Sequence, residues 1–141
     1  MFKLVKILNG RQNVGEPVRL TRTASTAFDV GDLLVLSSGR LIQANATSAG
    51  PYYIAAEKVD STRKDYASAT GMLVTPVTPD MIFEAPLSEY DTSLAEGGKV
   101  TVNVVSSHAV GVTSTAKDGV VTVHSLAGTG SGHLFLRVRF V

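Results

Sequence analysis

The chain has 141 residues, with 13 basic and 12 acidic side chains and therefore a formal net charge of +1. This near-neutral balance argues against broad, charge-driven binding to nucleic acid or to an anionic membrane. Because cysteine is absent, disulfide bonds, thiolate nucleophiles and cysteine-ligated metals are excluded. The length suits one domain, so we expect residues 1–141 to form a single domain.

The first residues mix apolar and basic side chains. Lys3 and Lys6 interrupt the apolar run that a signal peptide requires, and no later stretch reaches the roughly 18 apolar residues of a membrane helix. Residues 1–17 are therefore interpreted as a first strand or as an N-terminal arm. Residues 1–22 hold five basic residues and one acidic residue, a net charge of +4, whereas the rest of the chain carries −3. This asymmetry is typical of a solvated strand face or of an arm that docks on an acidic neighbour.

Short apolar runs and turn residues alternate through the middle of the chain. Residues 33–36 and 41–44 flank the turn-forming residues 37–40, and this pattern predicts a β-hairpin. Further apolar runs bounded by Gly, Pro or Asp indicate strands at residues 52–56, 72–77 and 81–85.

The last third shows the period-two alternation of half-buried strands. Valine alternates with polar residues in 100–104 and 121–124, and Arg137 and Arg139 lie opposite the apolar face of 134–140. Val, Ile and Thr together make up 37 of the 141 residues, a composition that suits pleated sheets.

The elements together predict an all-β fold, a single small β-barrel or sandwich of roughly nine to eleven short antiparallel strands. At most one or two short helices are expected. The better candidate is residues 88–95, and the weaker one, residues 60–65, is equally well a solvated loop.

The histidines give no indication of a metal or catalytic site. His108, His124 and His133 lack the close spacing of ligand pairs on one strand or helix. No G-x-S-x-G motif is present, and the strand-to-helix turn that this motif requires is not expected in an all-β chain. We therefore expect no catalytic residue and no metal site, and the chain is not expected to be an enzyme.

Two other features have structural explanations. The glycine-rich residues 128–132 precede a predicted strand, whereas a phosphate-binding loop precedes a helix N-terminus. Asp29 and Asp32 flank Gly31, a pattern typical of a β-turn closed by an aspartate side chain. Neither feature predicts a cofactor, and none is expected.

Three passages follow one another in a set order. The first is residues 28–36 with residues 39–44, a Val-Gly-Asp turn followed by strand, turn and strand. The second is residues 71–77, continuing to residues 81–85. The third comprises residues 94–102, 119–123 and 134–140. In order and spacing, these passages resemble the head decoration (cement) proteins of tailed bacteriophages, and they cover the chain from residue 18 to its end.

The resemblance implies a structural virion protein that binds the outer surface of an assembled phage capsid and reinforces the seams between subunits. Its implied partners are the major capsid protein and other copies of itself in a homo-oligomer such as a trimer, with no nucleic acid and no membrane. Such a protein would be made in the host cytoplasm and would reside on the outer capsid surface.

The first strand and its basic residues form the hypothesised docking segment. Its members are Phe2, Lys3, Leu4, Lys6 and Arg11, which combine apolar contact area with charge that suits an acidic capsid surface. Two alternatives stay open: a tail, baseplate or fibre module of a virion, and a β-barrel that binds oligonucleotide or sugar.

Overall fold

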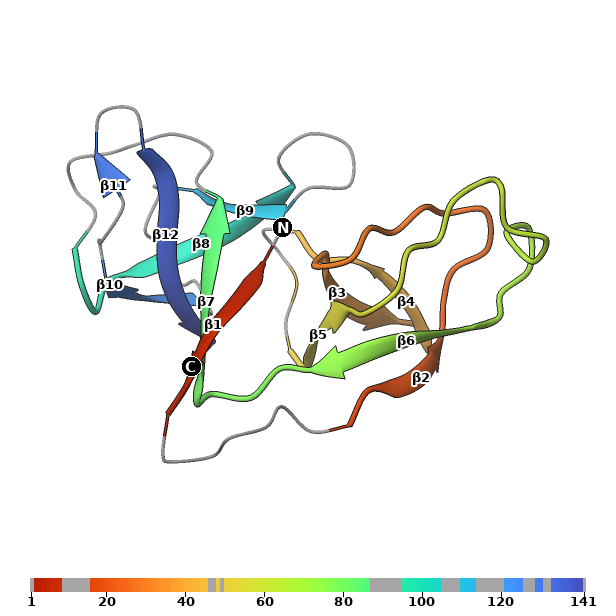
Figure 1. The fold of residues 1–141 in the computed structure, drawn as a ribbon, viewed down its shortest axis with the longest axis horizontal. Helices are drawn as coiled ribbons and strands as arrows, with labels where there is room; N and C mark the ends of the chain where they lie inside the picture. Colours follow the sequence, from red (N-terminus) through yellow and green to blue (C-terminus); the bar gives the residue numbers. More distant parts are fainter. Residues whose placement is uncertain are drawn as a thin grey trace.

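The computed structural model describes the backbone of residues 2–8, 16–45, 48, 50–86, 95–104, 110–113, 121–125, 129–130 and 133–140. Within these ranges, all helical or strand structure is β-strand, arranged as one seven-stranded and one five-stranded sheet. Every strand pairing is antiparallel, and the two sheets pack side by side as a sandwich-like molecule (Figure 1). The predicted all-β class is thus confirmed, and of the two predicted architectures the sandwich is the one observed.

The five-stranded sheet is built from the first half of the chain. In spatial order it contains β2 (Val18–Thr21), β6 (Gly71–Pro76), β5 (Tyr52–Ala55), β3 (Leu33–Ser37) and β4 (Arg40–Gln43). The predicted hairpin is β3–β4, which closes with Ser37 opposite Arg40. At its tip, Ser38 and Gly39 have φ angles of 50° and 77°, the positive values that a two-residue type I′ turn requires.

The two edges of this sheet approach each other. Arg22 forms an isolated parallel bridge with Leu41, and the Thr23 N–H donates to the Leu41 carbonyl at 3.2 Å. The resulting curl encloses a small core whose buried members are Phe28, Leu34, Leu41, Ala55, Val59, Met72 and Val74.

The seven-stranded sheet combines the first strand with the second half of the chain. Its path is β1 (Lys3–Ile7), β7 (Met81–Pro86), β12 (His133–Phe140), β10 (Val121–Ser125), β8 (Lys99–Val104) and β9 (Val110–Thr113), and β11 (Thr129–Gly130) pairs with β12. β1 and β12 lie on either side of β7, so strands from opposite ends of the sequence share one neighbour.

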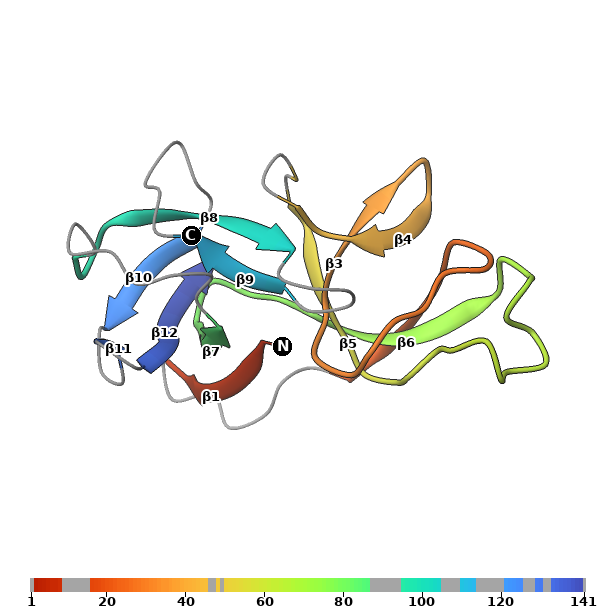
Figure 2. The same ribbon diagram turned by 90° about the horizontal axis from the view of Figure 1, so that it is seen from above.

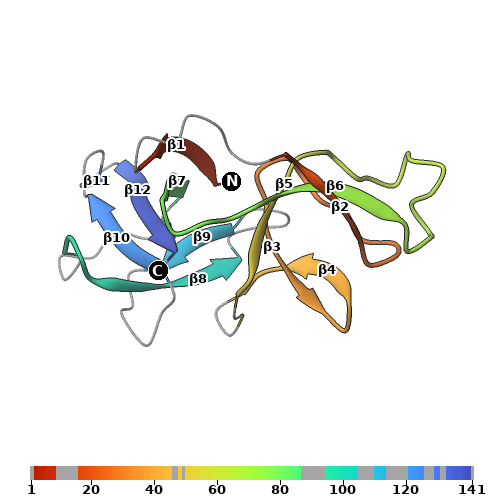
Figure 3. The ribbon, with the colours of Figure 1, turned by 90° about the horizontal axis from the view of Figure 1, so that it is seen from below.

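The main core lies between the two sheets. Phe2, Tyr52, Phe83 and Phe140 form an aromatic cluster with ring centroids 5.1–6.2 Å apart. β3 contributes to both cores, because Leu33 and Val35 pack in the main core and the intervening Leu34 packs in the smaller one. Figures 2 and 3 show the start of β1 at the boundary between the two sheets.

The two helix candidates and the number of strands can also be compared with the expectations. Residues 60–65 form turns, so the loop interpretation of this segment is the correct one, and the better helix candidate, residues 88–95, lies almost wholly outside the described residues. The described part of the chain holds twelve strands, one above the expected range, because the two-residue β11 is counted. In the same residues no helix has the length and hydropathy to cross a membrane.

Candidate functional site

The hypothesised docking residues have different environments. Lys3 and Lys6 are exposed on β1, and Leu4 is half-buried. Phe2 is only 2 % exposed and contacts Phe83 and Phe140, so in this conformation its side chain anchors β1 in the core instead of meeting a partner. Arg11 lies outside the described residues.

One row of charged side chains crosses the outer face of the larger sheet. Lys3 on β1 is opposite Glu84 on β7, and Glu84 is opposite Arg137 on β12. Residues paired across neighbouring strands project to the same face of a sheet. Lys3, Glu84 and Arg137 therefore lie side by side, on the face opposite the buried Phe83 and Val138.

A second row runs parallel to the first. Lys6 is opposite Ile82 on β7, while Arg139 is opposite Thr122 on β10, and Thr122 is opposite Lys99 on β8. Ile82 lies two positions from Glu84 along β7, and Arg139 lies two positions from Arg137 along β12. The pleat therefore places the second row on the same face as the first.

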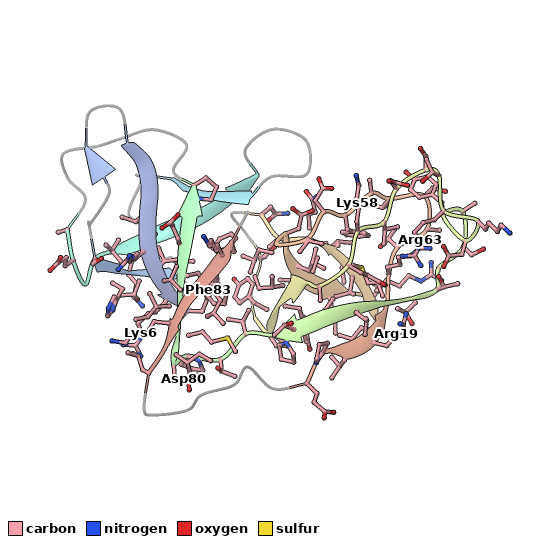
Figure 4. The ribbon with its side chains drawn as sticks, viewed as in Figure 1. Lys6, Arg19, Lys58, Arg63, Asp80 and Phe83 are labelled. Atoms are coloured by element: carbon pink, nitrogen blue, oxygen red, sulfur yellow. The ribbon has the colours of Figure 1, made fainter. Side chains whose placement is uncertain are left out.

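We call Lys3, Lys6, Glu84, Lys99, Arg137 and Arg139 the basic sheet face. Five of these six side chains are basic. The six residues come from four strands, β1, β7, β8 and β12, which belong to both ends of the sequence. Arg139 is held in place, because its Nε and Nη2 donate to the Pro79 carbonyl at 3.1 and 3.0 Å. Figure 4 shows Lys6 on the side of β1 that faces away from the five-stranded sheet. The arrangement concentrates positive potential on one rigid surface, which attracts an acidic partner.

An apolar groove opens next to the same strand, between the two sheets. Its volume is about 130 Å³, and one polar side chain contributes to an otherwise apolar lining of Phe2, Leu4, Ile54, Thr75, Met81 and Phe83. The groove therefore suits an apolar side chain better than a charged group.

A charged cluster also lies beside the five-stranded sheet, between the end of β2 and the loop that joins β5 to β6. Arg22 is fully buried, and its guanidinium donates to the Asp65 carbonyl at 2.7 Å, the Tyr66 carbonyl at 3.3 Å and Thr70 Oγ1 at 3.2 Å. Arg63 donates two hydrogen bonds of 3.0 Å to the Asp65 carboxylate. These bonds from Arg63 and a further one from Thr70 Oγ1, together with the positive charges of Arg63 and Arg22, lower the pKa of Asp65 to about 2. The cluster fixes the loop between β5 and β6.

The Asp29–Asp32 turn has the predicted structural role. Asp32 Oδ2 accepts hydrogen bonds from the Asp29 N–H at 2.9 Å and from Gln43 Nε2 at 3.0 Å, so the carboxylate closes the turn that precedes β3. Burial of this side chain raises the pKa of Asp32. Within the described residues, no group of three or more His, Cys, Asp or Glu side chains is arranged to hold a metal ion.

Sequence reasoning included Arg19 and Arg22 in the basic N-terminal segment, but the structure separates them from it. Arg22 is buried, and Arg19 lies on β2 of the five-stranded sheet, 3.8 Å from the carboxylate of Glu57 in the loop that follows β5. Sequence reasoning also placed Arg137 and Arg139 together on one strand face. It missed that this face is shared with Lys3 and Lys6, because no local signal shows which strands are neighbours.

Comparison of the chain with protein-family models, with curated proteins and with solved structures found no match. Function is therefore inferred from the chain's own surfaces.

Proposed function

We propose that this chain is a structural protein that attaches to the outer surface of an assembled bacteriophage head through its basic sheet face. The observation that carries the proposal is the charge of that face: its two rows hold five basic side chains and one acidic one, Glu84, on β1, β7, β12 and β8 of one sheet. Charge complementarity of this kind selects an acidic protein surface and fixes its orientation. The resemblance of the sequence passages to head decoration proteins supports the same conclusion.

The position of the face suits a mechanical role. Its side chains project from strands joined through backbone ladders, with β1 and β12 both paired to β7. A load applied to the face is therefore shared among segments that are distant in sequence. A standard interface takes about 800 Å² from each partner. The accessible surface of 7359 Å² leaves room for a second contact across a seam between head subunits.

Attachment at a seam would favour the assembled state of the head. A protein that binds only the expanded arrangement of subunits stabilises that arrangement by mass action. Reinforcement then requires no chemical step, only contacts that are absent from the unexpanded shell.

Co-sedimentation with expanded, empty heads of the virus that encodes the chain tests the proposal. The triple variant Lys3→Glu, Lys6→Glu, Arg137→Glu should no longer pellet with heads, and higher salt should weaken pelleting of the unmodified protein. The matched control is Arg40→Glu, Lys58→Glu, Lys64→Glu, which reverses three exposed charges on the other half of the molecule. Equal pelleting of the two triple variants would contradict the proposal.

Pelleting with isolated tails and binding of oligonucleotides test the two alternatives. Pelleting with isolated tails but not with heads would favour a tail or baseplate module. Salt-sensitive binding of single-stranded oligonucleotides would favour a nucleic-acid binder. The latter is less well supported, because neither of the two described rows of the face contains the aromatic side chains on which bases stack.

A further inference from the structure

β1 has an edge that could accept another strand. It is the terminal strand of the larger sheet, pairing with β7 on one side and with no other described strand. Both of its ends are held, because the Phe2 N–H donates to the Gly31 carbonyl at 2.8 Å and the Leu8 N–H donates to the Asp80 carbonyl at 2.7 Å. A fixed strand whose outer edge is left uncovered by the strands of the described residues is a template for strand addition.

The apolar groove adjoins this edge. Leu4 contributes to the groove from β1, while Ile54 and Thr75, which are opposite each other on β5 and β6, form the other wall. Side chains on neighbouring strands project to the same face at paired positions. A residue placed beside Leu4 on an added strand would therefore direct its side chain into the groove.

The size of the groove limits what can enter it. Its volume is about 130 Å³, and an apolar cavity of about 150 Å³ holds one benzene molecule. One branched aliphatic side chain therefore fits, whereas a second large side chain does not.

The side chains on the outer face of β1 determine which charge an added strand should carry. Lys3 and Lys6 are exposed there, on either side of the irregularity in the β1–β7 register, and Val5 between them is 38 % exposed. Residues of an added strand that alternate with the aliphatic one would lie next to these lysines. Acidic side chains at those positions would form cross-strand pairs of opposite charge.

We propose that the edge of β1 that no described strand covers binds an extended acidic segment of a partner protein as an additional strand, with one branched aliphatic side chain in the groove. The proposal rests on the proposed function for the identity of the partner, the head surface. It adds that part of the attachment is a directional, sequence-selective contact, whereas the basic sheet face alone would tolerate many acidic surfaces.

A synthetic peptide tests the chemistry without heads. The probe is a capped nonapeptide with glutamate at even positions, threonine at odd positions and leucine at the centre. Amide chemical-shift changes on titration are expected to concentrate at Leu4, Val5, Ile54 and Thr75. Replacing the central leucine with threonine should weaken binding roughly tenfold or more, and replacing the glutamates with lysine should abolish it. Changes centred on the edges at β2 or β4, or equal binding of the lysine peptide, would overturn the proposal.

Head binding by groove variants separates this proposal from the proposed function. Ile54→Trp fills the groove without changing charge, and Thr75→Met does so from the neighbouring strand if the first variant fails to fold. Weaker pelleting of a folded groove variant supports strand addition. Unchanged pelleting of that variant, together with loss in the charge-reversal triple, refutes strand addition and leaves the proposed function standing. If even the unmodified protein fails to pellet, the proposed function fails, and the peptide titration alone decides whether the edge binds acidic strands.

Discussion

Arg22 and Asp65 form an ion pair, 3.3 Å between Nη2 and Oδ1, in which the guanidinium is fully buried and the carboxylate is 36 % exposed. The pair joins the end of β2 to the loop between β5 and β6. Because Arg22 also donates to two backbone carbonyls of this loop, the loop is held by a side chain more than 40 residues away in the sequence.

Arg22→Met should lower the free energy of unfolding by about 3 kcal/mol, because it leaves two partly buried carbonyl groups without a donor and Asp65 without its buried partner. Urea unfolding measures the change. Arg63→Met is the matched control: its guanidinium also pairs with Asp65 but is 29 % exposed, so the loss should stay below about 1 kcal/mol. Similar losses for the two variants would show that burial of Arg22 does not determine its contribution.

Stability should fall at low pH through Asp65. The pKa of this carboxyl is about 2 in the folded chain, below its ordinary value of 3.8. A depressed pKa stabilises the folded state above the unfolded pKa, and this contribution is lost as pH falls from 3.8 towards 2. The melting temperatures of the unmodified protein and of Asp65→Asn should therefore converge between pH 5 and pH 2. A difference that is constant over this range would contradict the expectation.

The β3–β4 turn offers a test of backbone conformation alone. A Cβ added at Gly39 would meet no atom within 4 Å, yet φ at this residue is +77°. Gly39→Ala should therefore cost about 1 kcal/mol through backbone strain without any steric clash. Ser38→Asn should raise the melting temperature, because asparagine tolerates the positive φ of this position better than serine. Thermal unfolding of both variants checks the pair of opposite effects.

Asp32 should behave as a hydrogen-bond acceptor and not as a necessary charge. Asp32→Ala removes the acceptor for the Asp29 N–H and for Gln43, and should cost about 1–3 kcal/mol. Asp32→Asn retains an oxygen at the same place and should cost distinctly less. Equal losses in chemical unfolding would mean that the charge itself is required.

Phe2→Ala should destabilise the chain by about 3–5 kcal/mol, because it empties a site in the main core against Phe83 and Phe140. Lys3→Gln with Lys6→Gln should leave the melting temperature nearly unchanged, since both side chains are exposed and the change places no second acid opposite Glu84. Calorimetry of these variants separates the anchoring role of Phe2 from the surface role of the lysines.

The structural features that could be predicted from the sequence are those that depend on neighbouring residues. The β3–β4 hairpin followed from turn residues between two apolar runs, and the buried face of β12 followed from strict alternation. The neighbours of β1 could not be predicted, because the pairing of Lys3 with Glu84 joins residues about 80 positions apart. The burial of Phe2 could not be predicted either, because alternation distinguishes two faces of a strand but does not show which face is covered.

The shared neighbour of β1 and β12 affects how the chain acquires its structure during synthesis. All five strands of the smaller sheet lie between Val18 and Pro76, so that sheet can form while translation continues. The larger sheet lacks the β12 side of β7 until residues 135–138 of β12 have left the ribosome. Nascent chains should therefore carry an unpaired β7 edge for much of elongation, a state that favours association between chains on neighbouring ribosomes.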